Sequence, residues 1–230
     1  MHDPLADLAG LAGVPSAVAA ALDSVDTVLR DRGLRGVPVT TAAASLVTGA
    51  RGNAFLTEDG DRWLPGAVRL STELTGLAAV VRVAPAQALA RAHALVAHGL
   101  VPDEALGRLG NPAARERMAG VTALLTGRSG VSAVVLAAVV HAEIATVHPF
   151  GSGDGLVARG VEHMVLVSAG VDPRALIPVE AGHAHTPAAY RSALQGYESG
   201  SLQGVRNWLL HCAAALSRGA ELSGVGTGED

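Results

Sequence analysis

HPFGSGDGLVAR, running from His148 to Arg159, is the segment that decides how this 230-residue chain folds. An apolar helical pattern leads into it through Val147, and a second helical pattern starts inside it and continues through Met164. The glycine-rich turn between them therefore lies at a helix N-terminus, where unpaired backbone N–H groups and the helix dipole favour an anion. A histidine beside such a turn can accept a proton near neutral pH. The segment predicts a phosphate-binding turn with a base at its edge.

Helical patterns fill most of the chain and are separated by glycine, proline and short polar segments. Besides the helix that follows the turn, the expected helices span residues 15–32, 38–50, 67–81, 85–98, 112–126, 131–147, 187–197 and 205–218. Residues 60–65 are expected to break the chain, 99–112 to form a loop or a short β-hairpin flap, and 180–185 to form a polar loop. The sequence predicts an all-α fold of roughly eight to ten helices around the pair that carries the motif.

Three parts are expected along the chain: an N-terminal helical annex over residues 1–37, the main helical domain over 38–218, and a C-terminal tail over 219–230. Hydrophobic residues make up 49% of the chain and charged residues 17%, which supports a sizeable core. The net charge of −4 argues against nucleic acid as a partner, because binding to a phosphate backbone needs a basic patch. The N-terminal helix is also a candidate surface for a homodimer.

Cys212 is the only cysteine, so neither an intrachain disulfide nor a multi-cysteine zinc site can form. Its register with Val205 and Leu209 predicts a buried thiol. The N-terminus lacks the pattern of a signal peptide, and the apolar stretch 131–147 is short for a bilayer span and contains His141. We therefore expect a cytoplasmic protein with no membrane partner.

Five residues of the opening segment stand at the spacings of a known motif. The matching residues are His148, Phe150, Gly153, Gly155 and Arg159. They resemble the Fic (Fido) family signature His-x-Phe-x-Asp/Glu-Gly-Asn-Gly-Arg-x-x-Arg. The resemblance extends over roughly residues 38–217, since an apolar helix precedes the motif, a continuing helix follows it, and a segment with Tyr197 and Trp208 closes the domain. It implies a Fic-like helical fold.

In function, the resemblance implies protein adenylylation, in which AMP moves from ATP, with Mg²⁺, to a hydroxyl group of a target protein. His148 would be the general base and Phe150 would anchor the loop in the core. The nucleotide phosphates would be bound by Gly153, Asp154, Gly155 and Arg159. These roles agree with the chemistry of phosphoryl-type transfer, which depends mainly on positioning and on charge stabilisation.

Three residues depart from the signature. Ser152 replaces the metal-binding carboxylate and brings no negative charge to Mg²⁺. Asp154 replaces the asparagine, and a carboxylate about 4 Å from a phosphate costs on the order of 4 kcal/mol at an effective dielectric constant of about 20. Leu156 replaces the first arginine. We assign no metal ligand, and we favour a degenerate nucleotide site in a weak transferase or in a pseudoenzyme that binds a nucleotide or a partner protein.

Active adenylylation with His148 as base, transfer from another phosphorylated donor, and metal binding by Asp154 itself remain alternatives. In a decayed site His148 would cap the central helix and Arg159 would pair with Glu162. Many Fic proteins also carry an inhibitory Ser/Thr-x-x-x-Glu-Gly/Asn helix. Here Asn53 and Thr57 give part of that spacing without the glutamate, and Glu58 comes one residue late, so Glu58 is interpreted as part of a solvated turn.

Several other residues are candidates for a functional role. Residues 99–112 match by position the flap that aligns a target strand in Fic proteins, with Arg108 as an anchor. His141, Glu143 and His148 do not have the spacing of a zinc protease, so His141 is interpreted as structural. His183 and His185, beside Glu180, are assigned to a solvated loop, with metal binding or contact with a nucleotide or target as alternatives. His93 is expected to be a hydrogen-bonded core residue.

Overall fold

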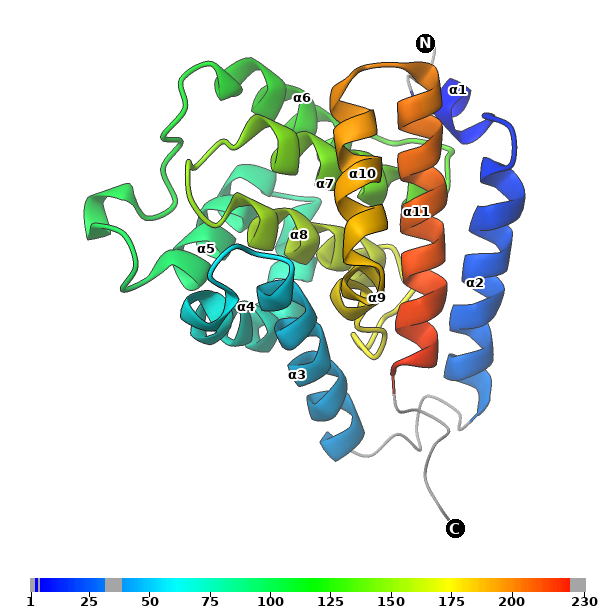
Figure 1. Ribbon diagram of the computed structural model, residues 1–230, viewed down its shortest axis with the longest axis horizontal. Helices are drawn as coiled ribbons and strands as arrows, with labels where there is room; N and C mark the ends of the chain where they lie inside the picture. Colours follow the sequence, from blue (N-terminus) through cyan, green and yellow to red (C-terminus); the bar gives the residue numbers. More distant parts are fainter. Residues whose placement is uncertain (1–2, 4, 32–38, 224–230) are drawn as a thin grey trace.

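The structure is a computed structural model that describes residue 3 and residues 5–31 and 39–223. Over these residues the fold is all-α, as predicted (Figure 1). The helices are α1 (Ala6–Ala9), α2 (Val14–Asp31), α3 (Val39–Phe55), α4 (Gly60–Val81), α5 (Pro85–Ala97), the 3-10 turn η1 (Asp103–Ala105), α6 (Ala114–Thr126), α7 (Ala133–Val147), α8 (Asp154–Ser168), α9 (Val179–His185), α10 (Pro187–Glu198) and α11 (Leu202–Glu221). None of them is long and apolar enough to cross a bilayer.

Helices α7 and α8 form the centre of the molecule and pack against each other. Most of their side chains are buried, which explains why α7 is apolar on every face. Helices α3, α4 and α5 cover α8 on one side, while α11 stands between α10 and α2 on the other (Figure 1). The Trp208 indole N–H on α11 donates to the Ala138 carbonyl on α7 at 2.8 Å, which ties the outer layer to the centre.

The first expected helix and the predicted buried thiol agree with the structure. Helix α2 buries Val14, Ala21 and Val25 and packs on α11, and Cys212 is fully buried. The boundary expected at residues 37 and 38 falls in 32–38, outside the described residues, as do 224–230 of the expected tail. The first part of that tail, from Gly219 to Glu221, belongs to α11.

The prediction of a break at residues 60–65 was wrong. Residues 60–65 do not break the chain, because α4 begins at Gly60 and runs through Pro65. The hydrogen bond that Pro65 cannot donate concerns only the Asp61 carbonyl, near the exposed start of the helix, and the buried residues from Gly66 onward hold α4 in place. Residues 99–112 form a loop, which was one of the two expectations, and not a β-hairpin: they hold η1, and an isolated bridge joins His98 to Val101.

Residues 180–185 form helix α9 and not the polar loop that the sequence predicts. Gly182 allows this helix to approach α11 very closely, because a Cβ atom at this position would lie 1.9 Å from the Ala215 carbonyl oxygen. Glu180 and His183 become buried in the process, whereas His185 stays exposed. Their polar groups must therefore find partners inside the protein.

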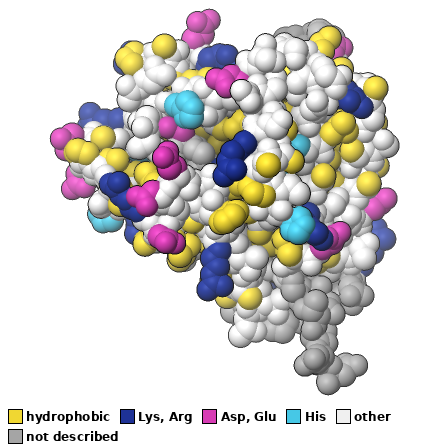
Figure 2. All heavy atoms as spheres, in the orientation of Figure 1, with side chains coloured by type: hydrophobic (Ala, Val, Ile, Leu, Met, Phe, Trp, Pro, Cys, Tyr) yellow, Lys and Arg dark blue, Asp and Glu magenta, His cyan; other side chains and the backbone are white. Residues whose placement is uncertain are grey.

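Figure 2 shows basic and acidic side chains interspersed over the face that it displays, with no extended patch of one sign. This distribution agrees with the small net charge of −4.

Candidate functional site

The motif loop joins the two central helices. Helix α7 is capped at its start by the Ser132 hydroxyl, which accepts a hydrogen bond from the Val134 N–H. It ends at His148, which adopts the left-handed conformation with φ 49° and exposes its side chain. Gly153, with φ 62°, then turns the chain into α8. The predicted base therefore lies at the surface, at the junction of the central helix with the loop.

The Asp154 side chain is buried inside this loop and binds its backbone. Its Oδ1 accepts a hydrogen bond from the Phe150 N–H at 2.8 Å, and the residue is only 4% exposed. Burial raises the pKa of the carboxyl group, although backbone N–H groups and the nearby His148 oppose that shift. The carboxyl group is thus held against the backbone of its own loop.

Phe150 and His93 form the base of the loop. Their rings stack with centroids 4.3 Å apart and an interplanar angle of 4°, and Phe150 is 8% exposed. His93 Nδ1 accepts a hydrogen bond from the Gly107 N–H at 2.9 Å, and its Nε2 faces the Ser152 hydroxyl at 3.4 Å. Burial lowers the pKa of His93. The prediction of a satisfied core histidine is confirmed, and this histidine links the flap to the motif.

The flap is attached at a second point. The N–H groups of Gly110 and Asn111 donate to the Pro149 carbonyl at 2.9 and 3.2 Å, and the Asn111 side-chain amide donates to the Val147 carbonyl at 3.2 Å. Arg108 is exposed between the two attachment points. The flap and the motif loop therefore form one hydrogen-bonded unit.

The two glycines predicted to approach phosphate are approached by side chains of this chain. A Cβ atom on Gly153 would lie 3.0 Å from the Trp63 ring, and one on Gly155 would lie 3.3 Å from a guanidinium nitrogen of Arg159. Leu156, at the position of the first arginine of the signature, is completely buried. An indole and a guanidinium group therefore pack directly against the helix N-terminus.

Arg159 is enclosed and hydrogen-bonded. Its Nε donates to Asn53 Oδ1 at 2.7 Å, its Nη1 to the Tyr190 hydroxyl at 2.9 Å, and its Nη2 to the Asn53 carbonyl at 3.1 Å and to the Thr57 hydroxyl at 2.9 Å. The residue is 2% exposed and its guanidinium carbon lies 5.6 Å from the centre of the Tyr190 ring. The pairing with Glu162 that the sequence suggested is wrong, because Glu162 is hydrogen-bonded to two histidines.

Sequence reasoning missed Asn53 and Thr57 as partners of Arg159. The two residues lie in the last turn of α3 and in the turn that follows it. In the sequence, their four-residue spacing resembles only an incomplete inhibitory motif. Glu58 is exposed in that turn, which confirms its interpretation as solvated.

Beneath Arg159 lies a buried polar network that connects helices α7 to α11. Tyr190 Oη lies 3.0 Å from His141 Nε2, and His141 Nδ1 lies 2.5 Å from Glu162 Oε2. The same carboxylate oxygen lies 2.8 Å from His183 Nε2, and His183 Nδ1 lies 3.1 Å from His211 Nε2. His183 was predicted in a solvated loop, and this was wrong because α9 carries it into the core.

Burial and neighbouring charged groups shift the pKa values in this network. Burial lowers the pKa of His141 to about 4 and that of His211 to about 3. Burial alone would raise the pKa of Glu162, but His183 and His141 lower it well below its usual range. The distances fit one order of hydrogen bonds: Arg159 to Tyr190 to His141 to Glu162, and His211 to His183 to Glu162.

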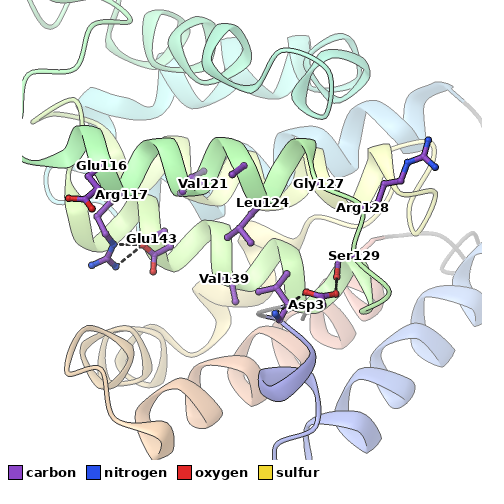
Figure 3. Close-up of a pocket in the computed structure, with 13 residues that line it drawn as sticks. Asp3, Glu116, Arg117, Val121, Leu124, Gly127, Arg128, Ser129, Val139 and Glu143 are labelled. Carbon is purple, nitrogen blue, oxygen red and sulfur yellow. Dashed lines mark hydrogen bonds and ion pairs between the residues drawn. The ribbon is translucent and has the colours of Figure 1, made fainter. Parts of the chain in front are cut away.

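The spacing predicts that Glu143 forms no metal site with His141 and His148, and in the structure its side chain has other partners. It accepts hydrogen bonds from Arg117 Nε at 2.6 Å and from the Tyr197 hydroxyl at 2.7 Å. This ion pair lies at one end of a hollow of about 560 Å³ along α6 and α7, with Asp3 and Ser129 at the other end (Figure 3). The residues that line this hollow include none of the motif.

The fold is similar to a solved structure whose family agrees with the motif. A crystal structure of a Fic family protein from Desulfovibrio desulfuricans G20 superposes with a TM-score of 0.68, at 18% sequence identity, over 100% of this chain and 77% of that chain. No family model matches the sequence, and no curated protein matches it. The chain therefore has the all-α fold of the Fic family, and at this identity the likeness concerns the fold alone.

Proposed function

We propose that this chain is a non-catalytic Fic-like protein that acts by binding a partner protein, and that its motif loop stabilises the fold. The observation that carries the proposal is the environment of Arg159. The signature uses this arginine for the terminal phosphates, whereas here Asn53, Thr57 and Tyr190 occupy its donors. A pseudoenzyme that retains a nucleotide site would need this arginine free, so a protein partner is favoured over a nucleotide.

The three departures from the signature support the same proposal. The Ser152 hydroxyl faces His93, the Asp154 carboxyl group bonds to the Phe150 N–H, and Leu156 fills the core. No positive charge replaces the missing first arginine at this position. To free Arg159 for phosphate would leave its present partners unpaired, at about 1–3 kcal/mol for each buried group.

Adenylyl transfer is the second candidate, and one observation favours it. His148 is exposed, and two of the three side chains that hold Arg159 belong to a single segment around the end of α3. Movement of that segment would release Arg159 toward ATP and Mg²⁺. The imidazole would then take a proton from a target hydroxyl while that hydroxyl attacks the α-phosphate and pyrophosphate leaves.

Labelled ATP separates the two candidates. The chain, its His148→Ala variant and an Asn53→Ala/Thr57→Val variant are incubated with α-labelled ATP and Mg²⁺ or Mn²⁺, alone and with cell lysate, and ATP binding is measured by calorimetry. The proposal predicts no protein label and no heat of binding with any of the three. Label that requires His148 would overturn it in favour of transfer. Saturable ATP binding without label would replace the protein partner by a nucleotide.

A further inference from the structure

Three potential metal ligands from three different helices meet in the core. They are His141 on α7, Glu162 on α8 and His183 on α9. Their ligand atoms all lie within 4.8 Å of one another, and their side chains are 0%, 3% and 0% exposed. We propose that this His–Glu–His cluster binds one divalent transition-metal ion, with Zn²⁺ as the ion that suits it best.

The donor set selects the class of metal. Two imidazole nitrogens and one carboxylate oxygen are ligands of Zn²⁺ and of other late first-row ions. Ca²⁺ and Mg²⁺ are disfavoured, because they require mostly oxygen ligands. Cys212 is the only thiol of the chain and is not part of the cluster, so the site differs from a thiolate zinc site.

The distances define what metal entry requires. Around Zn²⁺ with bonds of about 2.0–2.1 Å, tetrahedral ligand atoms lie roughly 3.3 Å apart. The distances from Glu162 Oε2 to the two imidazole nitrogens, now 2.5 and 2.8 Å, must therefore increase by about 0.8 and 0.5 Å. The ligands stand on separate helices, so small side-chain rotations can supply this change without unwinding any helix.

The outer nitrogens of both imidazoles already have hydrogen-bond partners. His141 Nε2 lies 3.0 Å from Tyr190 Oη, and His183 Nδ1 lies 3.1 Å from His211 Nε2. Metal-binding histidines commonly use the second ring nitrogen in this way, which fixes the orientation of the ring. Metal binding requires both rings to carry their proton on the outer nitrogen, so His183 Nδ1 then donates to His211 Nε2 and His211 carries its own proton on Nδ1.

The net charge of the metal-loaded cluster indicates which fourth ligand the ion would take. Zn²⁺ with Glu162 leaves one positive charge in the core, and Arg159 adds another beyond Tyr190. An anionic fourth ligand such as hydroxide, which Zn²⁺ forms readily from water, would reduce this excess. Without metal, the same residues form the complete hydrogen-bond chain described above. The two states therefore differ in metal content and in the tautomers of His141, His183 and His211.

The test uses the full chain without a polyhistidine tag. Metal content is measured by mass spectrometry after purification from zinc-supplemented medium. The protein is then stripped with a chelator and titrated with Co²⁺, whose ligand-field absorption reports tetrahedral nitrogen and oxygen ligands. We expect about one metal ion per chain and a saturable Co²⁺ spectrum that Zn²⁺ abolishes. His183→Gln and Glu162→Gln should each lose the spectrum.

His185→Gln is the matched control, because this histidine is exposed on the same short helix and lies outside the cluster. It should retain full metal binding. Long-range ¹H–¹⁵N spectra of the wild-type protein provide a readout that does not depend on any variant folding, since Zn²⁺ should change the tautomers of His141, His183 and His211. Wild-type protein with no bound metal, no Co²⁺ spectrum and unchanged tautomers would overturn the proposal. So would binding that survives both ligand substitutions.

Discussion

Arg159 donates from Nε to Asn53 Oδ1 at 2.7 Å, across 106 residues of sequence, and neither residue is more than 2% exposed. This contact joins the end of α3 to the second turn of α8. Each N–H group of a buried guanidinium needs an acceptor, because a buried donor without one loses its hydration and gains no hydrogen bond in return. The motif arginine thereby becomes part of the packing between two helices.

Asn53→Leu tests this role. The substitution removes the acceptor of Nε without removing volume, so we expect the free energy of unfolding to fall by about 3 kcal/mol. Thr57→Val should cost only about 1 kcal/mol, because the Asn53 carbonyl still accepts from Nη2. Urea denaturation followed by circular dichroism measures both. An Asn53→Leu protein as stable as wild type would mean that Arg159 reaches solvent instead.

His163 forms a second buried charge cluster, between Glu180 and Asp172. Its Nδ1 lies 3.0 Å from Glu180 Oε1, and its Nε2 lies 3.6 Å from Asp172 Oδ2 with no hydrogen-bond partner among the described residues. Burial lowers the pKa of His163, but the two carboxylates outweigh it and raise the pKa to about 10. The ring is therefore protonated at neutral pH and balances negative charge where α8, α9 and the preceding loop meet.

This raised pKa predicts a loss of stability in alkali. The folded pKa of about 10 exceeds the reference value of 6.5, so the stabilisation is complete below pH 6.5 and disappears as the pH rises through 10. We expect the free energy of unfolding to fall by roughly 2 to 4 kcal/mol over that range. His163→Gln should be less stable at pH 6.5 and nearly independent of pH. A wild-type curve that is flat from pH 6.5 to 10 would show that the ring is neutral.

The sequence predicted the parts of this fold that depend on local patterns. The apolar run of α7, the glycine turn and the helix after it can be recognised from neighbouring residues, and the helical patterns along the rest of the chain indicate the all-α class. It did not predict α9, because Glu180 and His183 become buried only through partners on α8 and α11. Contacts such as Asn53 with Arg159, or His141 with Glu162, join distant segments and leave no local periodicity to detect.

The sequence likewise predicted only part of the candidate site. The spacing of His148, Phe150 and Arg159 was visible in the sequence, and so was the loss of charge at Ser152. What surrounds Arg159 was not, because Asn53 and Thr57 look like ordinary polar residues at the end of a helix. A signal existed for the buried network: Glu162 and His141 interrupt otherwise apolar helical faces, and a buried polar group requires a partner.

His148 occupies a position that glycine would suit better. Its φ of 49° is left-handed, its side chain is exposed, and it ends α7 in the manner of a C-terminal cap. His148→Gly should therefore raise the free energy of unfolding by about 0.5–1 kcal/mol, or the melting temperature by about 1–4 °C. His148→Ala keeps the strained backbone and should bring no gain. If glycine destabilises the protein, the imidazole makes contacts that hold the loop.

Asp154→Asn tests whether the buried negative charge of Asp154 destabilises this loop. The asparagine oxygen can still accept the Phe150 N–H, while the charge that burial disfavours is removed. Because the folded pKa of Asp154 is raised above its reference value of 3.8, the wild-type protein is penalised above the folded pKa and relieved below pH 3.8. The variant should therefore be more stable than wild type at pH 7, and the difference should shrink toward zero near pH 3.8.

Asp154→Ala supplies the matched comparison, since it removes the acceptor together with the charge. It should lower the free energy of unfolding by about 1–2 kcal/mol at pH 7, because the buried Phe150 N–H loses its partner. Denaturation of the three proteins at both pH values separates the hydrogen bond from the charge. If asparagine destabilises the loop as much as alanine does, the ionised carboxylate itself holds the loop closed through its several backbone N–H contacts, and the departure from the Fic signature at this position is a stabilising one.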